Sequence, residues 1–133
     1  MILSKQAVAL CASVLVLAFA ASAAAQPTRV DEVWRCTLKD GKTPADVHAA
    51  NGAWVKFVNA KVEGGDIHSY VATNIVGNPT EFLYVDSFPN MKAWTDTKAE
   101  LQTDEGQAIE APLNEVATCS SNSLYLLTES ESR

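Results

Sequence analysis

The segment Glu81–Trp94, EFLYVDSFPNMKAW, decides the fold, because it has the pattern of a buried strand that runs directly into a helix. Side chains alternate between the two faces of a strand. Leu83 and Val85 therefore share one face, and the opposite face carries Phe82, Tyr84 and Phe88. A strand that is apolar on both faces needs cover on both, which predicts a central place in a sheet with helices on one side.

The helix after this strand has clear start signals. Pro89 fixes φ for a first helical turn, and the Asn90 side chain can cap the free backbone amides. Its predicted buried side consists of residues at helical spacing: Met91, Trp94 and Leu101. No catalytic motif accompanies the segment, so it predicts a fold and not an activity.

Residues 1–25 have the pattern of a secretory signal peptide. A short basic start with Lys5 precedes an apolar run from Ala7 to Ala20 and a small-residue exit at 21–25. The run is shorter than the roughly 20 residues that a membrane helix needs. We therefore expect cleavage after Ala25, export to the periplasm or the medium, and no membrane association afterwards. A single domain is expected at 26–128, with an exposed leader at 26–31 and a polar tail at 129–133.

Charge and motifs exclude several function classes. The chain has 16 acidic and 10 basic residues and a net charge of −6, which disfavours nucleic acid as a partner because such binding requires clustered Lys and Arg. The two histidines, His48 and His68, are separated by a whole predicted helix, and no paired carboxylates stand at ligand spacing. We expect no metal site, no cofactor and no serine nucleophile of the G-x-S-x-G type.

The element order predicts an α+β fold. Strands are expected at 32–39, 67–76, 81–88 and 122–128, and helices after Thr43, at 91–101 and from Thr103 onward. Pro112 is expected to kink or break this last helical region. The order is β-α-β-β-α-β, the ferredoxin-like arrangement: an antiparallel sheet with helices on one face, in which the first and third strands are central and the last strand lies beside the first.

The first helix has a defined apolar stripe. Thr43, Pro44 and Asp46 are its start signals. The stripe is formed by residues that project to one side, Val47, Ala50, Trp54, Phe57 and Val58, with Asn51 at its edge and His48 outside it. Gly52 costs about 1 kcal/mol relative to Ala in mid-helix, which favours a close packing contact there, with a backbone irregularity as the alternative.

Two cysteines, Cys36 and Cys119, remain after the predicted cleavage, in a compartment where disulfides persist. The last strand runs antiparallel to the first, so its start lies beside the later half of the first strand, where Cys36 sits. We predict a Cys36–Cys119 disulfide with Cα atoms about 4.4 to 6.8 Å apart. Two buried free thiols and a redox pair are the alternatives, although the spacing is not CxxC.

Residues 82–94, FLYVDSFPNMKAW, within this element order resemble the dimeric α/β-barrel superfamily, which includes small monooxygenases of the antibiotic-biosynthesis type. The resemblance implies a homodimer in which the sheets of two subunits pack face to face. The chain also resembles uncharacterised exported bacterial proteins around residues 64–67, GGDI, and 119–122, CSSN. Some haem-degrading members of the superfamily use Asn, Trp and His together. Asn51, Trp54 and His68 do not align with that constellation, so its activity is not transferred.

His68, Tyr70, Tyr84 and Asp86 form the strongest candidate ligand-binding group, with Asn51 and Trp54 as further candidates. If the hairpin around 77–80 pairs Tyr70 with Asp86, these side chains share one face inside a barrel. His68 could then accept a proton, with Asp86 fixing its tautomer. The alternative is that they hydrogen-bond across a dimer interface, where tyrosine is common. A slip of one residue in register would separate them.

Two functions remain open from the sequence. The first is an exported, non-catalytic domain that dimerises through its sheet and holds a small ligand. The second is a cofactor-independent monooxygenase or isomerase that acts on a small aromatic or lipophilic molecule.

Overall fold

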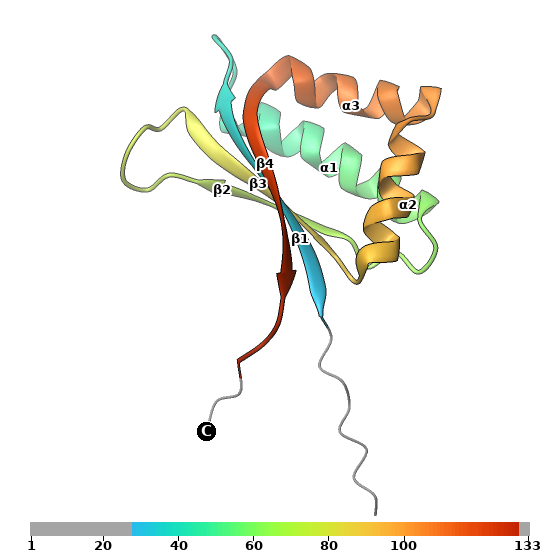
Figure 1. Ribbon diagram of the computed structural model, residues 1–133. Coiled ribbons are helices and arrows are strands. Elements are labelled where there is room, and N and C mark those ends of the chain that lie inside the picture. Colours follow the sequence, from blue (N-terminus) through green and yellow to red (C-terminus); the bar gives the residue numbers. More distant parts are fainter. Residues whose placement is uncertain (1–27, 131–133) are drawn as a thin grey trace, which may run out of the picture.

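The computed structural model describes residues 28–130, so the predicted signal peptide and residues 131–133 lie outside the described part of the chain. The elements follow in the order β1 (Arg29–Leu38), α1 (Pro44–Lys61), β2 (His68–Thr73), β3 (Glu81–Phe88), α2 (Met91–Leu101), α3 (Asp104–Val116) and β4 (Ala117–Leu127). The four strands form one antiparallel sheet in the order β2-β3-β1-β4. All three helices lie on the same side of this sheet (Figure 1). The predicted ferredoxin-like α+β fold, with β1 and β3 central, is confirmed.

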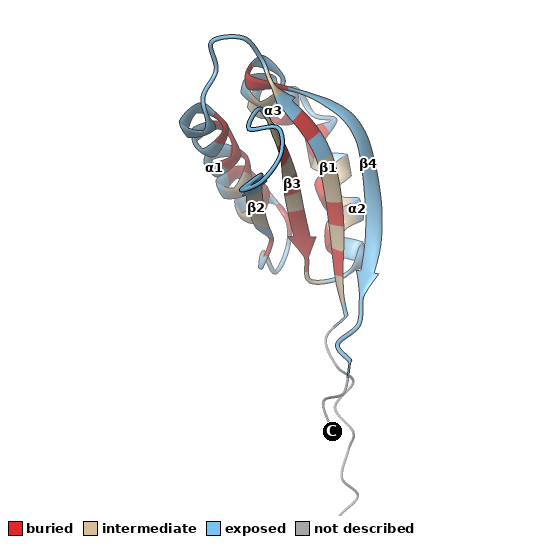
Figure 2. Cartoon of the chain, turned by 90° about the vertical axis from the view of Figure 1, so that its left-hand side faces the viewer, coloured by how far each residue is buried: buried red, intermediate tan, exposed pale blue. Residues whose placement is uncertain are grey.

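The helix-covered face of the sheet and the helices enclose the core. The predicted stripe of α1 is confirmed, since Val47, Ala50, Trp54, Phe57 and Val58 are all buried. In α2 the buried side chains are Ala93, Thr97 and Leu101, whereas Met91, predicted to be buried, is 49% exposed. The other face of the sheet is open in the single chain, and Figure 2 shows β4 exposed along nearly its whole length.

The start signals of α1 and α3 behave as predicted, whereas Pro89 lies before the first turn of α2, because Asn90 is the N-cap and the helix begins at Met91. The Thr43 side chain accepts a hydrogen bond from the Asp46 amide, and the Asp46 carboxylate accepts one from the Thr43 amide, which completes a capping box. Thr103 caps α3 without a capping box: its hydroxyl oxygen accepts a hydrogen bond from the Gly106 amide. α3 is continuous through Pro112, so the expected break there is wrong. Proline removes one hydrogen bond, and here the chain turns instead at Gln102–Thr103, where α2 ends.

Several strand limits differ from the prediction. β1 begins at Arg29 rather than Glu32, because residues 29–31 pair with β4 and Val30 is buried, so these residues do not belong to an exposed leader as expected. β4 begins at Ala117, directly after α3, rather than at Asn122. β2 ends at Thr73, and the predicted strand residues Ile75 and Val76 lie fully exposed in the connecting loop.

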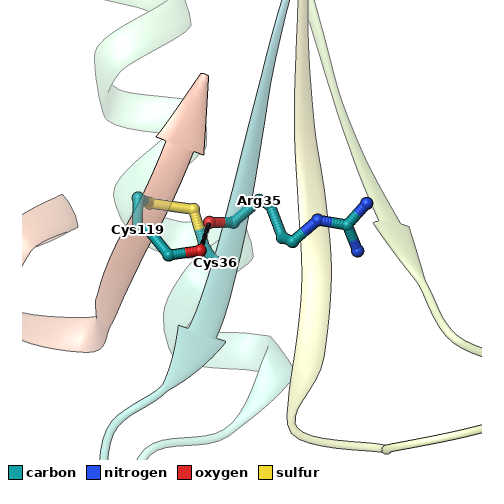
Figure 3. Close-up of a disulfide and its surroundings, with 4 residues drawn as sticks. Arg35, Cys36 and Cys119 are labelled. Carbon is teal, nitrogen blue, oxygen red and sulfur yellow. Dashed lines mark hydrogen bonds between the residues drawn. A yellow bond between two sulfur atoms is a disulfide. The ribbon is translucent and has the colours of Figure 1, made fainter. Parts of the chain in front are cut away.

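The predicted disulfide is confirmed. Cys36 on β1 lies directly opposite Cys119 on β4, and their sulfurs are bonded (Figure 3). The Cα atoms are 3.9 Å apart, closer than the expected range, and the pairing of β1 with β4 shifts register immediately beside Cys36. Arg35, the preceding residue, extends away from the bridge (Figure 3). The disulfide therefore joins a central strand to an edge strand of the sheet.

Gly52 does not make the predicted packing contact. A Cβ placed on it would meet no atom within 4 Å, and α1 is unbroken around it. Gly106 is the crowded glycine, since its Cβ would lie 2.2 Å from the Glu100 carbonyl oxygen. Glycine at 106 therefore allows α3 to approach the end of α2.

Within residues 28–130, no helix is long and apolar enough to cross a bilayer. The same residues contain no group of three His, Cys, Asp or Glu side chains that could hold a metal ion.

Candidate functional site

A cavity of about 130 Å³ lies between the helices and the covered face of the sheet and opens to solvent. Three aromatic side chains line it: Trp34 from β1, Trp54 from α1 and Tyr84 from β3. Its polar lining comes from four elements and consists of Asn51, Asp86, Lys98, Glu110 and Asn114. The cavity therefore combines aromatic walls with a small set of hydrogen-bonding groups, the usual composition of a small-molecule site.

The structure brings four of the six candidate residues to this cavity, namely Asn51, Trp54, Tyr84 and Asp86. It places His68 and Tyr70 on the opposite, open face of the sheet. The predicted pairing of Tyr70 with Asp86 is wrong by one residue, because Ser69 lies opposite Asp86 and Tyr70 lies opposite Val85. A one-residue slip moves every side chain of a strand to the other face. His68 instead contacts Asp66 at 3.1 Å and stacks with Tyr70.

Asp86 is the central polar group of the cavity. It is 7% exposed, and its Oδ1 accepts a 2.5 Å hydrogen bond from the Ser69 hydroxyl. Burial raises the pKa of Asp86 to about 6, the Ser69 hydrogen bond and Lys98 oppose this rise, and the nearby acidic Glu32 adds to it. The carboxyl group can therefore exchange a proton near neutral pH.

The Ser69 hydroxyl also lies 3.1 Å from Oδ1 of Asn51 on α1. A hydroxyl has one proton to donate, so Ser69 serves Asp86 when that carboxylate is ionised. When Asp86 is protonated, it can donate to Ser69, and Ser69 can then donate to Asn51. Ser69 can thus hydrogen-bond to the carboxyl group in both of its protonation states, with Asn51 as its own acceptor when Asp86 is protonated.

Tyr84 supplies a hydroxyl that is not satisfied within the described chain. The residue is 6% exposed, its hydroxyl oxygen is buried, and it has no hydrogen-bond partner there. Burial, with the Asp86 charge as a second cause, raises the pKa of Tyr84 to about 12, so the phenol stays neutral. Leaving such a group unpaired costs about 1–3 kcal/mol, which a ligand acceptor could recover.

Lys98 on α2 is held by an ion pair with the buried Glu32 at 2.5 Å. The Glu32 carboxylate also accepts hydrogen bonds from the Trp94 ring nitrogen at 3.1 Å and from Asn122 at 3.0 Å. Lys98 Nζ lies 5.6 Å from the centre of the Trp34 ring and 5.8 Å from that of Trp94. The lysine charge is therefore fixed and matched by Glu32, and Trp34 is oriented by it.

Glu110 on α3 is the second acidic group that lines the cavity. Partial burial raises the pKa of its carboxyl group, Lys98 opposes this rise, and Glu32 adds to it. No ion pair to Glu110 occurs among residues 28–130, so its charge is not matched as that of Glu32 is.

Sequence reasoning missed Trp34, Lys98, Glu110 and Asn114 as members of the site. Trp34 lies on the face of β1 that the helices cover, but nothing local in the sequence singled it out. Glu110 and Asn114 each follow a residue of the apolar stripe of α3, Ile109 and Leu113. A polar residue beside a buried stripe was the available signal. Lys98 gives the same signal on α2, because it directly follows the buried Thr97.

Comparison with known proteins identifies the fold. No family model matches the chain, and no curated protein matches it by sequence. Among solved structures, SnoaB from Streptomyces nogalater, a cofactor-independent oxygenase, superposes with a TM-score of 0.58 at 14% identity, over 77% of this chain and 95% of SnoaB.

A protein from Caulobacter crescentus CB15, proposed to be an antibiotic biosynthesis monooxygenase, gives a TM-score of 0.53 at 14% identity, over 79% of this chain and 92% of its own. A protein from Bordetella bronchiseptica, proposed to have the same activity, gives a TM-score of 0.53 at 14% identity, over 77% of this chain and 98% of its own. At these identities the likeness concerns the fold alone. The chain thus shares its ferredoxin-like α+β fold with these three proteins, the fold that its sequence predicts.

Proposed function

We propose that this protein is an exported homodimer in which each subunit binds a small aromatic molecule in the cavity between the helices and the sheet. The observation that carries the proposal is the unpaired, buried hydroxyl of Tyr84 and the buried carboxyl group of Asp86, two residues that line the same open cavity. Buried polar groups are normally hydrogen-bonded. A ligand that accepts from Tyr84 and donates to Asp86 would complete both.

The size and walls of the cavity support this class of ligand. A cavity of about 150 Å³ holds a benzene ring, and the present one measures about 130 Å³. Trp34, Trp54 and Tyr84 offer aromatic surface for offset or edge-to-face contacts. A single ring with one polar substituent is the ligand that best matches this lining.

The open face of the sheet supports the dimer. In the central strand β3, Leu83 and Val85 are only half-buried in the single chain. The same face carries exposed side chains on the two edge strands, Tyr70 on β2 and Tyr125 and Leu127 on β4. A second copy that packs its own open face here would cover these side chains. Export is supported by the pattern of residues 1–25 and by the disulfide, because such bonds persist mainly outside the cytosol.

A second candidate function is a cofactor-independent monooxygenase, and the pKa of Asp86, about 6, favours it. A general base works best with a pKa near the working pH. Asp86 would remove a proton from an acidic CH₂ group of the substrate, and the resulting anion would pass electrons to O₂. The balanced reaction turns the CH₂ group and O₂ into a carbonyl group and water, with all electrons drawn from the substrate. Return of the proton to another carbon would give an isomerase instead.

Chemical-shift mapping tests the binding site. Titration of the purified protein with phenol should shift the signals of Asn51, Trp54 and Tyr84 and leave those of His68 and Tyr70 unchanged. Shifts confined to the open sheet face would contradict the assigned cavity. Mass spectrometry of the protein as isolated would show any ligand that co-purifies with it.

Oxygen uptake tests the second candidate. Substrates with an acidic CH₂ group between carbonyl or aryl groups should consume one O₂ for each carbonyl formed, and Asp86→Asn should abolish this turnover. Unchanged turnover in Asp86→Asn would eliminate Asp86 as the base.

A further inference from the structure

The acidic groups of the cavity are not matched by cations. Asp86 and Glu110 line it together with one lysine, Lys98, whose charge is already paired with the buried Glu32. Asp31 and Glu32 are the other acidic groups close enough to act on Asp86. Among the described residues, no Arg or His lines the cavity.

The excess of acidic groups includes a carboxyl group that is almost completely buried. Asp86 is only 7% exposed. Its Oδ1 accepts the hydrogen bond from Ser69, which leaves Oδ2 free to accept one from a ligand. Glu110 is partly buried, and although Lys98 acts on both carboxylates, neither has an ion-pair partner among residues 28–130. Buried carboxylates without such a partner are unfavourable in the empty protein. A cationic ligand would remove that cost.

The walls suit the same ligand. Trp34 and Trp54 present indole rings to the cavity, and Tyr84 presents a phenol. Aromatic faces attract organic cations, tryptophan most strongly. Trp34 already lies beside one ammonium group, that of Lys98.

From these contacts we infer that the ligand is a small aromatic amine bound as its ammonium ion, with the charge between Asp86 and Glu110 and the ring among Trp34, Trp54 and Tyr84. The inference rests on the proposed binding of a small aromatic molecule in this cavity and specifies its chemical class. A neutral ring would fill the walls but leave both carboxylates unmatched. An anionic ring would be repelled by them, because Lys98 is already neutralised by Glu32.

Three probes of one shape separate these cases: benzylamine, benzyl alcohol and benzoate. The affinity of each probe is measured by calorimetric titration at pH 8, where Asp86 is ionised because its pKa is about 6. Benzylamine should bind about 10- to 100-fold more tightly than benzyl alcohol, the usual gain from a charge-assisted hydrogen bond. Benzoate should bind more weakly than either. Benzylamine should also lower the pKa of Asp86, followed by carbon NMR of its carboxyl group, whereas benzyl alcohol should not.

Charge-removing variants test the two carboxylates. Asp86→Asn and Glu110→Gln should each reduce the preference for benzylamine over benzyl alcohol from about 10- to 100-fold to about 3- to 10-fold, if each carboxylate supplies about half of the gain in binding free energy. Glu115→Gln is the matched control, because Glu115 lies exposed on the same helix as Glu110 and does not line the cavity. That variant should keep the full preference. Glu110 is only partly buried, so its variant remains informative if Asp86→Asn folds poorly.

The outcomes distinguish this inference from the proposed function. Equal binding of benzylamine and benzyl alcohol would overturn the ammonium assignment and leave the aromatic site standing. Tightest binding of benzoate would show that Lys98 controls the charge preference and would also overturn it. Binding of none of the three probes would count against the aromatic site itself.

Discussion

Ser69 on β2 donates a 2.5 Å hydrogen bond to Oδ1 of Asp86 on β3, on the helix-covered face of the sheet. The two residues are direct partners in the pairing of these strands. This bond stabilises the ionised carboxylate and limits a rise in the pKa of Asp86 that burial causes. Asp86 is therefore a group whose ionisation the fold disfavours but does not prevent at neutral pH.

Asp86→Asn should stabilise the protein at neutral pH. The folded-state pKa of about 6 exceeds the ordinary value of 3.8, so the folded state binds the proton more tightly than the unfolded state. The Asp86 contribution to stability is therefore fully present below about pH 4 and is lost as pH rises to about 6. Relative to wild type, the variant should gain about 1–3 kcal/mol in unfolding free energy at pH 8 and little at pH 4. Urea denaturation at both pH values measures this difference, and an equal effect at both would contradict the shifted pKa.

Tyr84→Phe should have opposite effects on stability and on ligand binding. The hydroxyl is buried without a partner, so its removal should raise the free energy of unfolding by about 1 kcal/mol in the empty protein. The same change should weaken binding of ligands that accept a hydrogen bond. Thermal denaturation with and without phenol measures both effects. A loss of stability in the empty protein would show that the hydroxyl has a partner.

Two glycine substitutions should differ in sign. Gly52→Ala adds a methyl group in open space on α1 and should raise the free energy of unfolding by about 0.5–1 kcal/mol, the helix propensity difference. Gly106→Ala forces a methyl group against the Glu100 carbonyl and should lower it by about 1–3 kcal/mol. Each variant is the control for the other, and chemical denaturation measures the free energy of unfolding of both. Equal effects would contradict the described approach of α3 to α2.

Reduction of the Cys36–Cys119 bond should lower stability strongly. The bond closes a loop of sequence separation 83. On the chain-entropy model a loop of this length is worth about 4 to 5 kcal/mol, and 1 kcal/mol shifts the melting temperature by roughly 4 to 8 °C in a small domain. The melting temperature should therefore fall by at least about 15 °C on this basis. Differential scanning calorimetry with and without reductant measures it, and the Cys36→Ala, Cys119→Ala double variant should match the reduced protein.

Val85→Asp should dissociate the proposed dimer. Val85 lies on the open face of the central strand, where a carboxylate would be buried without a partner in a sheet-to-sheet interface. Light scattering coupled to size-exclusion chromatography at micromolar concentration should give the mass of one chain for Val85→Asp. Ala53→Asp makes the same change of charge on an exposed position of α1 and should remain dimeric. A monomeric wild-type protein would rule out the dimer.

The sequence by itself determined the class of fold, because its strongest signals are local or depend only on strand order. The two-sided apolar pattern of residues 81–88 requires a central strand, and this is where β3 lies. Thr43, Pro44 and Asp46 fix the start of α1 through backbone geometry that involves only neighbouring residues. The disulfide followed from the antiparallel neighbours β1 and β4, which bring the part of β4 that carries Cys119 beside the later half of β1, where Cys36 lies.

Only the tertiary structure decided which residues share the candidate site. The two faces of β2 are similarly mixed, with Ser69 and Val71 on one and Tyr70 and Ala72 on the other, so hydrophobic pattern could not fix its register against β3. The packing of β3 beneath the helices resolved it, since Asp86 and Tyr84 face the core and take Ser69 and Val71 as partners. Lys98 and Glu110 joined the site for the same reason. A local pattern places each of them beside a buried or partly buried residue of its helix, but which residues of the sheet they face depends on how α2 and α3 lie over it.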